Sequence, residues 1–194
     1  DHGYIHQDIK PGNVMLGAYG EVLVLDWGCA LGTGGGTAPG EAAFGTPAYM
    51  SPEQARREGA DERSDIYCLG ATLYHMLTLH HPTWSDDPDT FWELKRRGEL
   101  TPLPAEVAAD LPGPLLDIAY KAMSAEPGDR YQSIGELREA LQAYLRHAES
   151  IGLAQEAVGG IARAESAGDY TAFAEISATL RHALRMWDGN RVAQ

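Results

Sequence analysis

The chain has 194 residues, of which 44% are hydrophobic and 22% are charged, a balance typical of a soluble globular protein. Its formal net charge of −13 argues against a nucleic-acid-binding surface, which would be basic, and against electrostatic attachment to an anionic membrane. Apolar runs such as residues 22–25 are far too short to span a bilayer. The first residues lack a Met and any signal-peptide pattern, so we expect a fragment of a longer protein. Only two cysteines occur, Cys29 and Cys68, and we interpret them as reduced thiols of a cytoplasmic chain, whose parent could be membrane-anchored elsewhere.

Two short apolar strands are expected near the start of the chain, at residues 14–16 and 21–25. A glycine-containing turn at residues 17–20 separates them, and two such strands around a tight turn predict a β-hairpin. The hairpin would bring Asn13 and Asp26, which flank it, to the same end. Two ligands of one metal ion need that proximity.

A glycine-rich segment follows at residues 32–40. A phosphate-cradling loop is one interpretation, but the segment lacks the G-x-x-x-x-G-K-[ST] spacing and no helix follows it directly. We therefore interpret it as a flexible loop.

Apolar residues recur at helical spacing through residues 64–79, which predicts a deeply buried helix. Asp65 stands at its amino-terminal end, where a carboxylate is expected to cap backbone N–H groups. Further helices are expected at residues 90–97, 115–124 and 134–147.

After residue 149 the sequence becomes rich in alanine, and residues 151–167 and 170–186 again have helical periodicity. These two helices predict a helical hairpin, either the start of a tetratricopeptide-like repeat or an ordinary extension. The sequence thus predicts a mainly α-helical fold with small β-hairpins in a domain at residues 1–147, followed by a helical extension at residues 148–194.

Groups suited to phosphoryl transfer occur in a fixed order near the start of the chain. Asp8 could orient a substrate hydroxyl and accept its proton, and Lys10 could neutralise charge on a transferring phosphoryl group. Asn13 and Asp26 offer the hard oxygen donors that Mg²⁺ prefers.

This order resembles the catalytic loop and metal-binding turn of bacterial, eukaryotic-like serine/threonine protein kinases, whose pattern is His-Arg-Asp, four residues, Asn, and then Asp-Phe-Gly. Here the pattern reads His6-Gln7-Asp8, then Asn13, then Asp26-Trp27-Gly28, so that Gln7 replaces the arginine and Trp27 the phenylalanine. Residues 45–53 are similar to the substrate-binding loop and Ala-Pro-Glu motif of the family, with Ser51 in place of alanine. Lys10 within Asp-Ile-Lys-Pro favours the serine/threonine branch over the tyrosine branch.

The resemblance implies a kinase-like carboxy-terminal lobe that transfers phosphate from ATP, with Mg²⁺, to serine or threonine hydroxyls of protein substrates. It implies that Asp8 is the catalytic base, that Lys10 is the phosphate partner, and that Asn13 and Asp26 are metal ligands. Thr46 is expected to hydrogen-bond Asp8 and Lys10, and Met15 to form the floor beneath the adenine ring. Supporting roles are implied for His6, Trp27, Gly28, Glu53, Asp65 and Arg130, with Arg130 pairing with Glu53.

The nucleotide-binding half of a kinase is not encoded in these residues, because no G-x-G-x-x-G loop and no Val-Ala-x-Lys strand is present. We expect an amino-terminal lobe from the same polypeptide as the partner of this chain, and little or no activity without it. A pseudokinase or scaffold that binds proteins without catalysis is the alternative. A third possibility gives the main function to the carboxy-terminal hairpin as a docking repeat.

The replacement of arginine by Gln7 removes a fixed cation beside the expected base. Such an arginine can pair with a phosphate on the activation segment and thereby order it. Glutamine cannot supply that charge, so we expect activity to depend only weakly on phosphorylation of Thr33 or Thr37.

Overall fold

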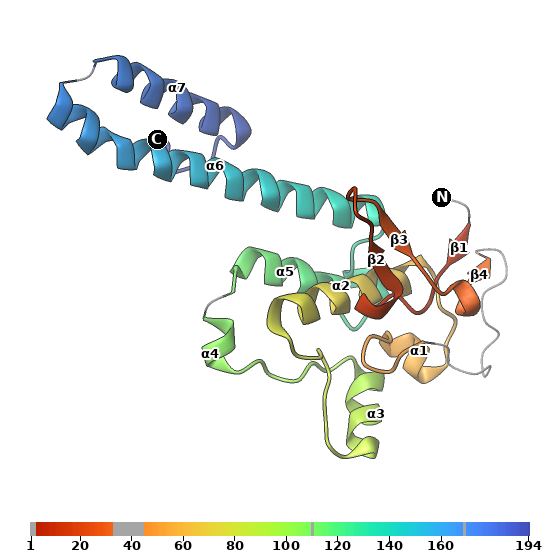
Figure 1. Cartoon of the computed structure of the whole chain (residues 1–194). Helices are drawn as coiled ribbons and strands as arrows, with labels where there is room; N and C mark the ends of the chain where they lie inside the picture. The colour runs from red at the N-terminus through yellow and green to blue at the C-terminus, as the bar shows by residue number, and fades with distance from the viewer. Residues whose placement is uncertain (1–2, 33–44, 110, 169) are drawn as a thin grey trace. The chain divides into compact units, whose positions relative to one another are not determined.

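The computed structural model describes residues 3–32, 45–109, 111–168 and 170–194 (Figure 1). The chain divides into two compact units, Asp1–Leu137 and Arg138–Gln194. The predicted domain boundary after residue 147 lies further along the chain than this division. The expected glycine-rich loop falls, apart from Gly32, outside the described residues, as do Thr33 and Thr37.

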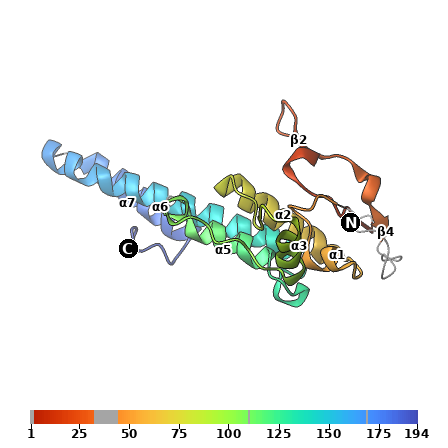
Figure 2. The ribbon, with the colours of Figure 1, turned by 90° about the horizontal axis from the view of Figure 1, so that it is seen from below.

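The first unit begins with two small antiparallel sheets. Strand β1 (Tyr4–Ile5) pairs with β4 (Leu31–Gly32), and β2 (Val14–Leu16) pairs with β3 (Val22–Val24). The β2–β3 pair is the hairpin that the sequence predicts, with Val14 opposite Val24 and a turn closed by Gly20 N–H donating to Gly17 O. Figure 2 shows the hairpin standing clear of the helices α2 and α5.

Helices make up the rest of this unit. They are α1 (Pro52–Arg56), α2 (Glu62–Thr78), α3 (Pro88–Arg97), α4 (Ala105–Ala108) and α5 (Gly113–Ala122), with short 3-10 turns η1 (Pro11–Asn13), η2 (Trp27–Cys29) and η3 (Pro127–Asp129). The mainly helical, kinase-like fold class that the sequence predicts is therefore confirmed.

The amino-terminal cap of α2 differs from the prediction. Asp61 caps the helix, because its carboxylate accepts from Arg63 N while Ser64 bonds back to Asp61 N in a capping box. The prediction that Asp65 performs this role is wrong. Its carboxylate instead binds a distant segment that is described with the site.

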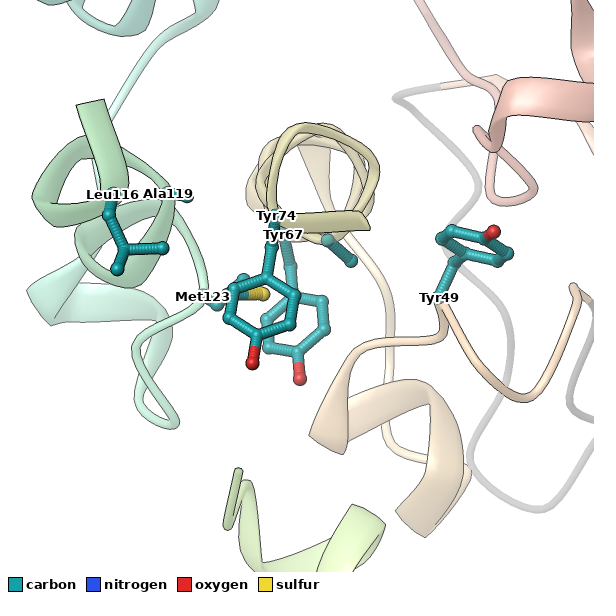
Figure 3. Close-up of a cluster of buried hydrophobic side chains, with 7 residues drawn as sticks. Tyr49, Tyr67, Tyr74, Leu116, Ala119 and Met123 are labelled. Carbon is teal, nitrogen blue, oxygen red and sulfur yellow. The ribbon is translucent and has the colours of Figure 1, made fainter. Parts of the chain in front are cut away.

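The core of the first unit lies where α2 packs along α5. Tyr67 and Tyr74 project from the same side of α2 beside Met123, as their spacing of two helical turns requires (Figure 3). Gly70 permits this close approach, since a Cβ atom there would lie 2.6 Å from Cβ of Ala122.

The second unit is a helical hairpin made of α7 (Tyr170–Met186) and of α6 (Ile134–Ala167) from Arg138 onward. The prediction of two separate helices before Gly168 is wrong, because α6 continues through residues 148–150, which contain no helix breaker. Buried alanines line the contact between the helices, where Ser150 Oγ donates to the carbonyl of Ala183 at 2.8 Å. None of the helices in the described part of the chain has the length and apolar character needed to cross a membrane.

Candidate active site

The segment between β1 and β2 carries the predicted base and is anchored to α2 by Asp65. The Asp65 carboxylate accepts from His6 N at 2.7 Å and from Gln7 N at 2.8 Å. Burial raises the pKa of Asp65, and the two backbone N–H groups oppose that shift. This long-range bond therefore holds a loop in place on the buried helix rather than capping the helix itself.

Asp8 is surrounded by hydrogen-bond donors from three residues. Lys10 Nζ lies 2.8 Å from Oδ2, Thr46 N lies 2.7 Å from Oδ1, and Asn13 Nδ2 lies 3.2 Å from Oδ2. Partial burial opposes ionisation of Asp8, but the bonds from Lys10 and Thr46 outweigh it and hold the pKa below its usual value. The carboxyl is therefore a negatively charged acceptor at neutral pH.

Lys10 joins this carboxylate to the segment that begins at Gly45. Its Nζ donates to Thr46 Oγ1 at 2.5 Å as well as to Asp8. The Thr46 hydroxyl thus accepts from Lys10, while the bond that Asp8 receives comes from the Thr46 backbone. Lys10 and Thr46 together connect the loop of the predicted base with the predicted substrate-binding loop.

The two predicted metal ligands lie at one end of the β2–β3 hairpin. Leu25 N donates to Asn13 O at 2.8 Å, so Asp26 follows directly after the residue opposite Asn13. Asn13 Nδ2 donates to the carbonyl oxygen and to the carboxylate of Asp8. The amide oxygen Oδ1 is therefore the atom of this side chain that could bind a cation. An amide oxygen and a carboxylate suit Mg²⁺, whose remaining positions are normally filled by phosphate oxygens and water. Among the described residues no cluster of three or more His, Cys, Asp or Glu side chains could hold a metal.

Asp26 begins the turn that the sequence identifies as the metal-binding turn. It adopts a left-handed φ of 61°, and its Oδ1 accepts from Gly28 N at 3.4 Å. Trp27 Nε1 donates to Val24 O at 2.9 Å, and its ring meets the ring of the buried His6 edge-on at 4.8 Å between centroids. His6 Nε2 lies 3.0 Å from Leu25 O, so His6 connects the loop to the turn.

Two glutamines that the sequence did not mark as site residues hold the same segments together. Gln7 Nε2 donates to Cys29 O at 3.1 Å, which ties the loop of Asp8 to the turn after Asp26. Gln54 Nε2 donates to Gln7 O at 2.9 Å. Gln7 is buried and has a φ of 68°, and a Cβ atom at Gly45 would lie 2.7 Å from Gln7 O. A neutral side chain thus occupies the position where the kinase pattern has arginine.

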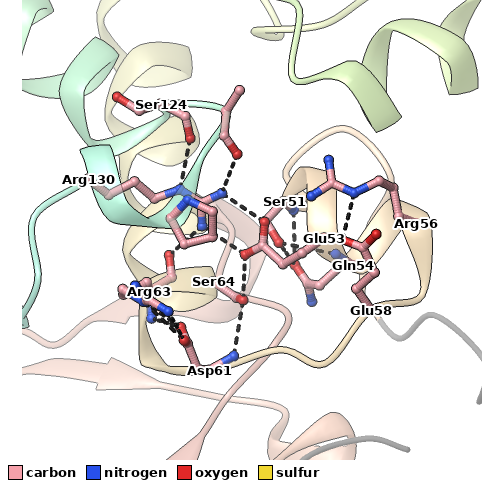
Figure 4. Close-up of polar contacts among 12 residues, drawn as sticks. Ser51, Glu53, Gln54, Arg56, Glu58, Asp61, Arg63, Ser64, Ser124 and Arg130 are labelled. Carbon is pink, nitrogen blue, oxygen red and sulfur yellow. Dashed lines mark hydrogen bonds and ion pairs between the residues drawn. The ribbon is translucent and has the colours of Figure 1, made fainter. Parts of the chain in front are cut away.

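The predicted pair of Arg130 and Glu53 lies near the amino-terminal ends of α1 and α2 (Figure 4). Arg130 Nη1 and Nη2 donate to Glu53 Oε1 and Oε2, both at 2.7 Å, and Ser64 Oγ donates to Oε1 at 2.7 Å. Burial opposes ionisation of Glu53, but the bonds from Arg130 and Ser64 outweigh it and lower the pKa to about 2. Arg130 also donates to the carbonyls of Arg63, Ser124 and Ala125. The pair therefore joins α1 to α2 and to the segment between α5 and η3.

Not every predicted site residue is enclosed by the chain. Met15 and Trp27 are 51% and 53% exposed, and apolar residues of β3 beside them are also exposed. Further exposed apolar side chains lie on both faces of the β2–β3 hairpin and on the turn after it. We call this set the exposed apolar strip: Met15, Leu16, Val22, Leu23, Val24, Leu25 and Trp27. Isolated exposed apolar residues are normal, but so many on one small hairpin beside polar side chains are typical of a binding surface.

The fold is that of a protein kinase carboxy-terminal lobe, and comparison with known proteins agrees. Residues 1–142 match the family described as protein kinase domain, and the chain belongs to that family. It is 37% identical over 170 residues to the serine/threonine-protein kinase PknD of Chlamydia trachomatis serovar D, a match that covers 74% of this chain and 18% of the relative. It is 39% identical over 143 residues to the serine/threonine-protein kinase PknB of Mycolicibacterium smegmatis, covering 72% of this chain and 23% of the relative. The matched part therefore spans about a fifth of these relatives' length.

Proposed function

We propose that this chain supplies the catalytic loop, the metal ligands and the substrate-binding loop of a serine/threonine protein kinase. The observation that carries the proposal is the cluster around Asp8, whose carboxylate accepts hydrogen bonds from Lys10, Asn13 and Thr46 and is held ionised by Lys10 and Thr46. Membership of the protein kinase domain family supports it, as does the similarity to two serine/threonine-protein kinases.

In the proposed reaction Asp8 orients the hydroxyl of a substrate serine or threonine. As the hydroxyl oxygen bonds to the γ-phosphorus of ATP, the bond from that phosphorus to the bridging oxygen breaks and ADP leaves. The hydroxyl proton passes to the Asp8 carboxylate. Lys10 Nζ, already bonded to Asp8 and Thr46, stabilises charge on the transferring group.

Mg²⁺ would be held by Asn13 and Asp26 and would neutralise charge on the phosphates of ATP. The amide group of Asn13 supports this assignment, because its nitrogen is bound to Asp8 and its oxygen remains as a ligand. A site with two protein ligands depends on the nucleotide to complete it, so we expect metal and ATP to bind together.

We further propose that the exposed apolar strip meets the adenine ring at Met15 and an amino-terminal kinase lobe of the same polypeptide. Exposure of this strip, together with the lack of a G-x-G-x-x-G loop in the sequence, supports that proposal. The 194-residue chain alone is accordingly expected to transfer no measurable phosphate.

The test is a phosphotransfer assay on the natural polypeptide that contains this chain, with radiolabelled ATP, Mg²⁺ and an array of serine- and threonine-containing peptides. Asp26→Asn should reduce transfer by roughly 10²–10³-fold, the range for removing one charge-stabilising group. Asp117→Asn, which changes an exposed carboxylate on α5, is the matched control and should retain full activity. A folded natural polypeptide that transfers no phosphate to any peptide would favour the scaffold alternative.

A further inference from the structure

A fully buried lysine lies beneath the predicted substrate-binding loop. Lys95, on α3, has 0% exposure, and its Nζ donates to the carbonyl oxygen of Ala48 at 3.2 Å. The same nitrogen lies 5.1 Å from the centre of the Tyr67 ring. Among the described residues no carboxylate forms an ion pair with Lys95. Burying a cation without a carboxylate partner lowers stability, so packing alone gives no reason for a lysine here.

The loop that contains Ala48 is held at three successive positions. Thr46 is bound to Asp8 and Lys10 as described. Tyr49 Oη lies 2.5 Å from Nδ1 of His75 on α2, and Lys95 on α3 binds the carbonyl between these two points. The contact with Lys95 therefore connects the loop to α3.

We infer that Lys95 is a positioning residue for protein substrates: by binding the Ala48 carbonyl, its ammonium group fixes the path of residues 46–50 and so sets substrate affinity. The inference rests on the proposed kinase function, since it assigns residues 46–50 to substrate binding. Lys95 has no contact with Asp8, Asn13 or Asp26 among the described residues, so its loss should affect peptide binding and leave the chemical step almost unchanged.

Lys95 should lose its charge within a pH range in which enzyme assays can be run. Burial lowers its pKa to about 8, and Cys68 and Glu53 oppose that shift. Five other titratable or charged groups surround Lys95. They are Glu53 on α1, Tyr67 and Cys68 on α2, His81 in the loop after α2, and Arg130 after η3. Glu53 is already bound by Arg130, so it does not neutralise Lys95. Loss of the proton above pH 8 turns a charge-assisted bond to Ala48 into a weaker neutral one.

Substrate affinity and stability should therefore respond to pH in opposite directions. The folded protein holds a cation whose pKa is lower than in the unfolded chain, so stability rises as the pH increases through about 8 toward the usual lysine value. Substrate affinity should fall over the same interval. A lysine that served only the core would not produce this opposition.

The first test compares Lys95→Met with wild type in the natural polypeptide, using a peptide that wild type phosphorylates on a serine/threonine array. The KM for the peptide should rise about tenfold at pH 7, as expected for loss of one hydrogen bond to a charged group. The kcat should stay within about twofold because the chemistry at Asp8 is untouched. Lys121→Met is the matched control, since Lys121 also lies over an aromatic ring, that of Tyr131, but on α5 and exposed.

The pH profile and the melting temperature separate positioning from packing. Wild-type KM should rise between pH 7 and 9, whereas the KM of Lys95→Met should be constant and its melting temperature equal to or above that of wild type. Lys95→Arg keeps its charge through this range and should hold the pH 7 affinity at pH 9. A Lys95→Met protein with wild-type KM and a wild-type pH profile overturns the inference.

A second readout requires no catalysis and uses the 194-residue chain. The amides of Tyr49 and Met50 donate to Thr46 O at 2.9 and 3.1 Å, so their hydrogen exchange reports on the loop. Lys95→Met should accelerate exchange at both amides, and Lys121→Met should not. If wild type transfers no phosphate but Lys95→Met still accelerates exchange, the kinase proposal fails while the contact with the loop stands. Equal exchange in wild type and Lys95→Met overturns the inference in either case.

Discussion

Two ion pairs in the first unit differ in how many of their N–H donor groups have an acceptor. Glu53 and Arg130 have side chains that are 6% and 0% exposed, and every nitrogen of the guanidinium donates to a protein oxygen. Asp8 and Lys10 are 10% and 25% exposed, and one of the three N–H donors of Lys10 has no partner among the described residues. The saturated pair can only stabilise structure, whereas the open pair retains a donor group that the proposed contact with a substrate would use.

The largest effect on stability is expected from breaking the saturated pair. Arg130→Met leaves the Glu53 carboxylate buried without its partner and should lower the free energy of unfolding of the 194-residue chain by about 3–5 kcal/mol, the usual cost of an orphaned buried charge. Urea denaturation measures it. Arg97→Met is the control: it removes an exposed pair with Glu93 and should cost less than about 0.5 kcal/mol. Equal losses in both variants would contradict the contrast between the pairs.

Breaking the open pair should instead remove activity. Asp8→Asn keeps the size of the side chain but removes the proton acceptor, so phosphotransfer by the natural polypeptide should fall roughly 10³-fold, within the range for general-base groups. The free energy of unfolding should fall by no more than about 1–2 kcal/mol, because only charge-assisted hydrogen bonds are weakened. A variant that keeps its activity, or that loses as much stability as Arg130→Met, would remove the distinction.

The saturated pair should also make the free energy of unfolding depend on pH in the acid range. The pKa of Glu53 is about 2 in the folded chain and near its usual value when unfolded, so the pair stabilises the fold above pH 4.5. That contribution, about 3 kcal/mol, is lost as the pH falls from 4.5 toward 2. Unfolding free energies measured at a series of pH values should show this loss. Glu53→Gln should flatten the dependence in that window, and an unchanged slope would exclude Glu53 as its source.

The smallest effect concerns Ser51, which stands beside the saturated pair where the family pattern has alanine. Ser51 Oγ accepts from Gln54 N, and Gln54 bonds back to Ser51 N, which together form a capping box on α1. Ser51→Ala restores the family residue yet should lower the unfolding free energy by about 1 kcal/mol. Ser166→Ala, at an exposed site on α6, should be neutral, and thermal unfolding of the two variants decides whether the cap matters.

Local patterns predicted the elements whose signals are local. The β2–β3 hairpin follows from two short apolar runs around a glycine-containing turn, and the buried α2 follows from helical periodicity. The continuity of α6 was missed because a change in composition near residue 149 was interpreted as a break, although no residue there terminates a helix.

Contacts between distant segments could not be predicted in the same way. Asp65 was interpreted from its neighbours as a helix cap, but it binds backbone groups 58 and 59 positions earlier. Lys95 lies on the apolar side of α3, four residues after Phe91 and next to Leu94, but its own charge gives no sign that its side chain is buried. The bond from Gln54 to the Gln7 carbonyl likewise depends on the fold, which brings two residues 47 positions apart together. The motif predicted which residues gather around Asp8, and tertiary packing supplied the residues that hold them.

The three-residue contact of Gln7, Gly45 and Gln54 has an evolutionary consequence. Gln7 O is held by the Gln54 amide, and any side chain at position 45 would collide with that same oxygen. The oxygen belongs to the main chain of residue 7, so the side chain at position 7 can change without loss of this contact, whereas positions 45 and 54 are constrained. Glycine at position 45 and a hydrogen-bond donor at position 54 should therefore persist among descendants of this gene, including any that carry arginine at position 7.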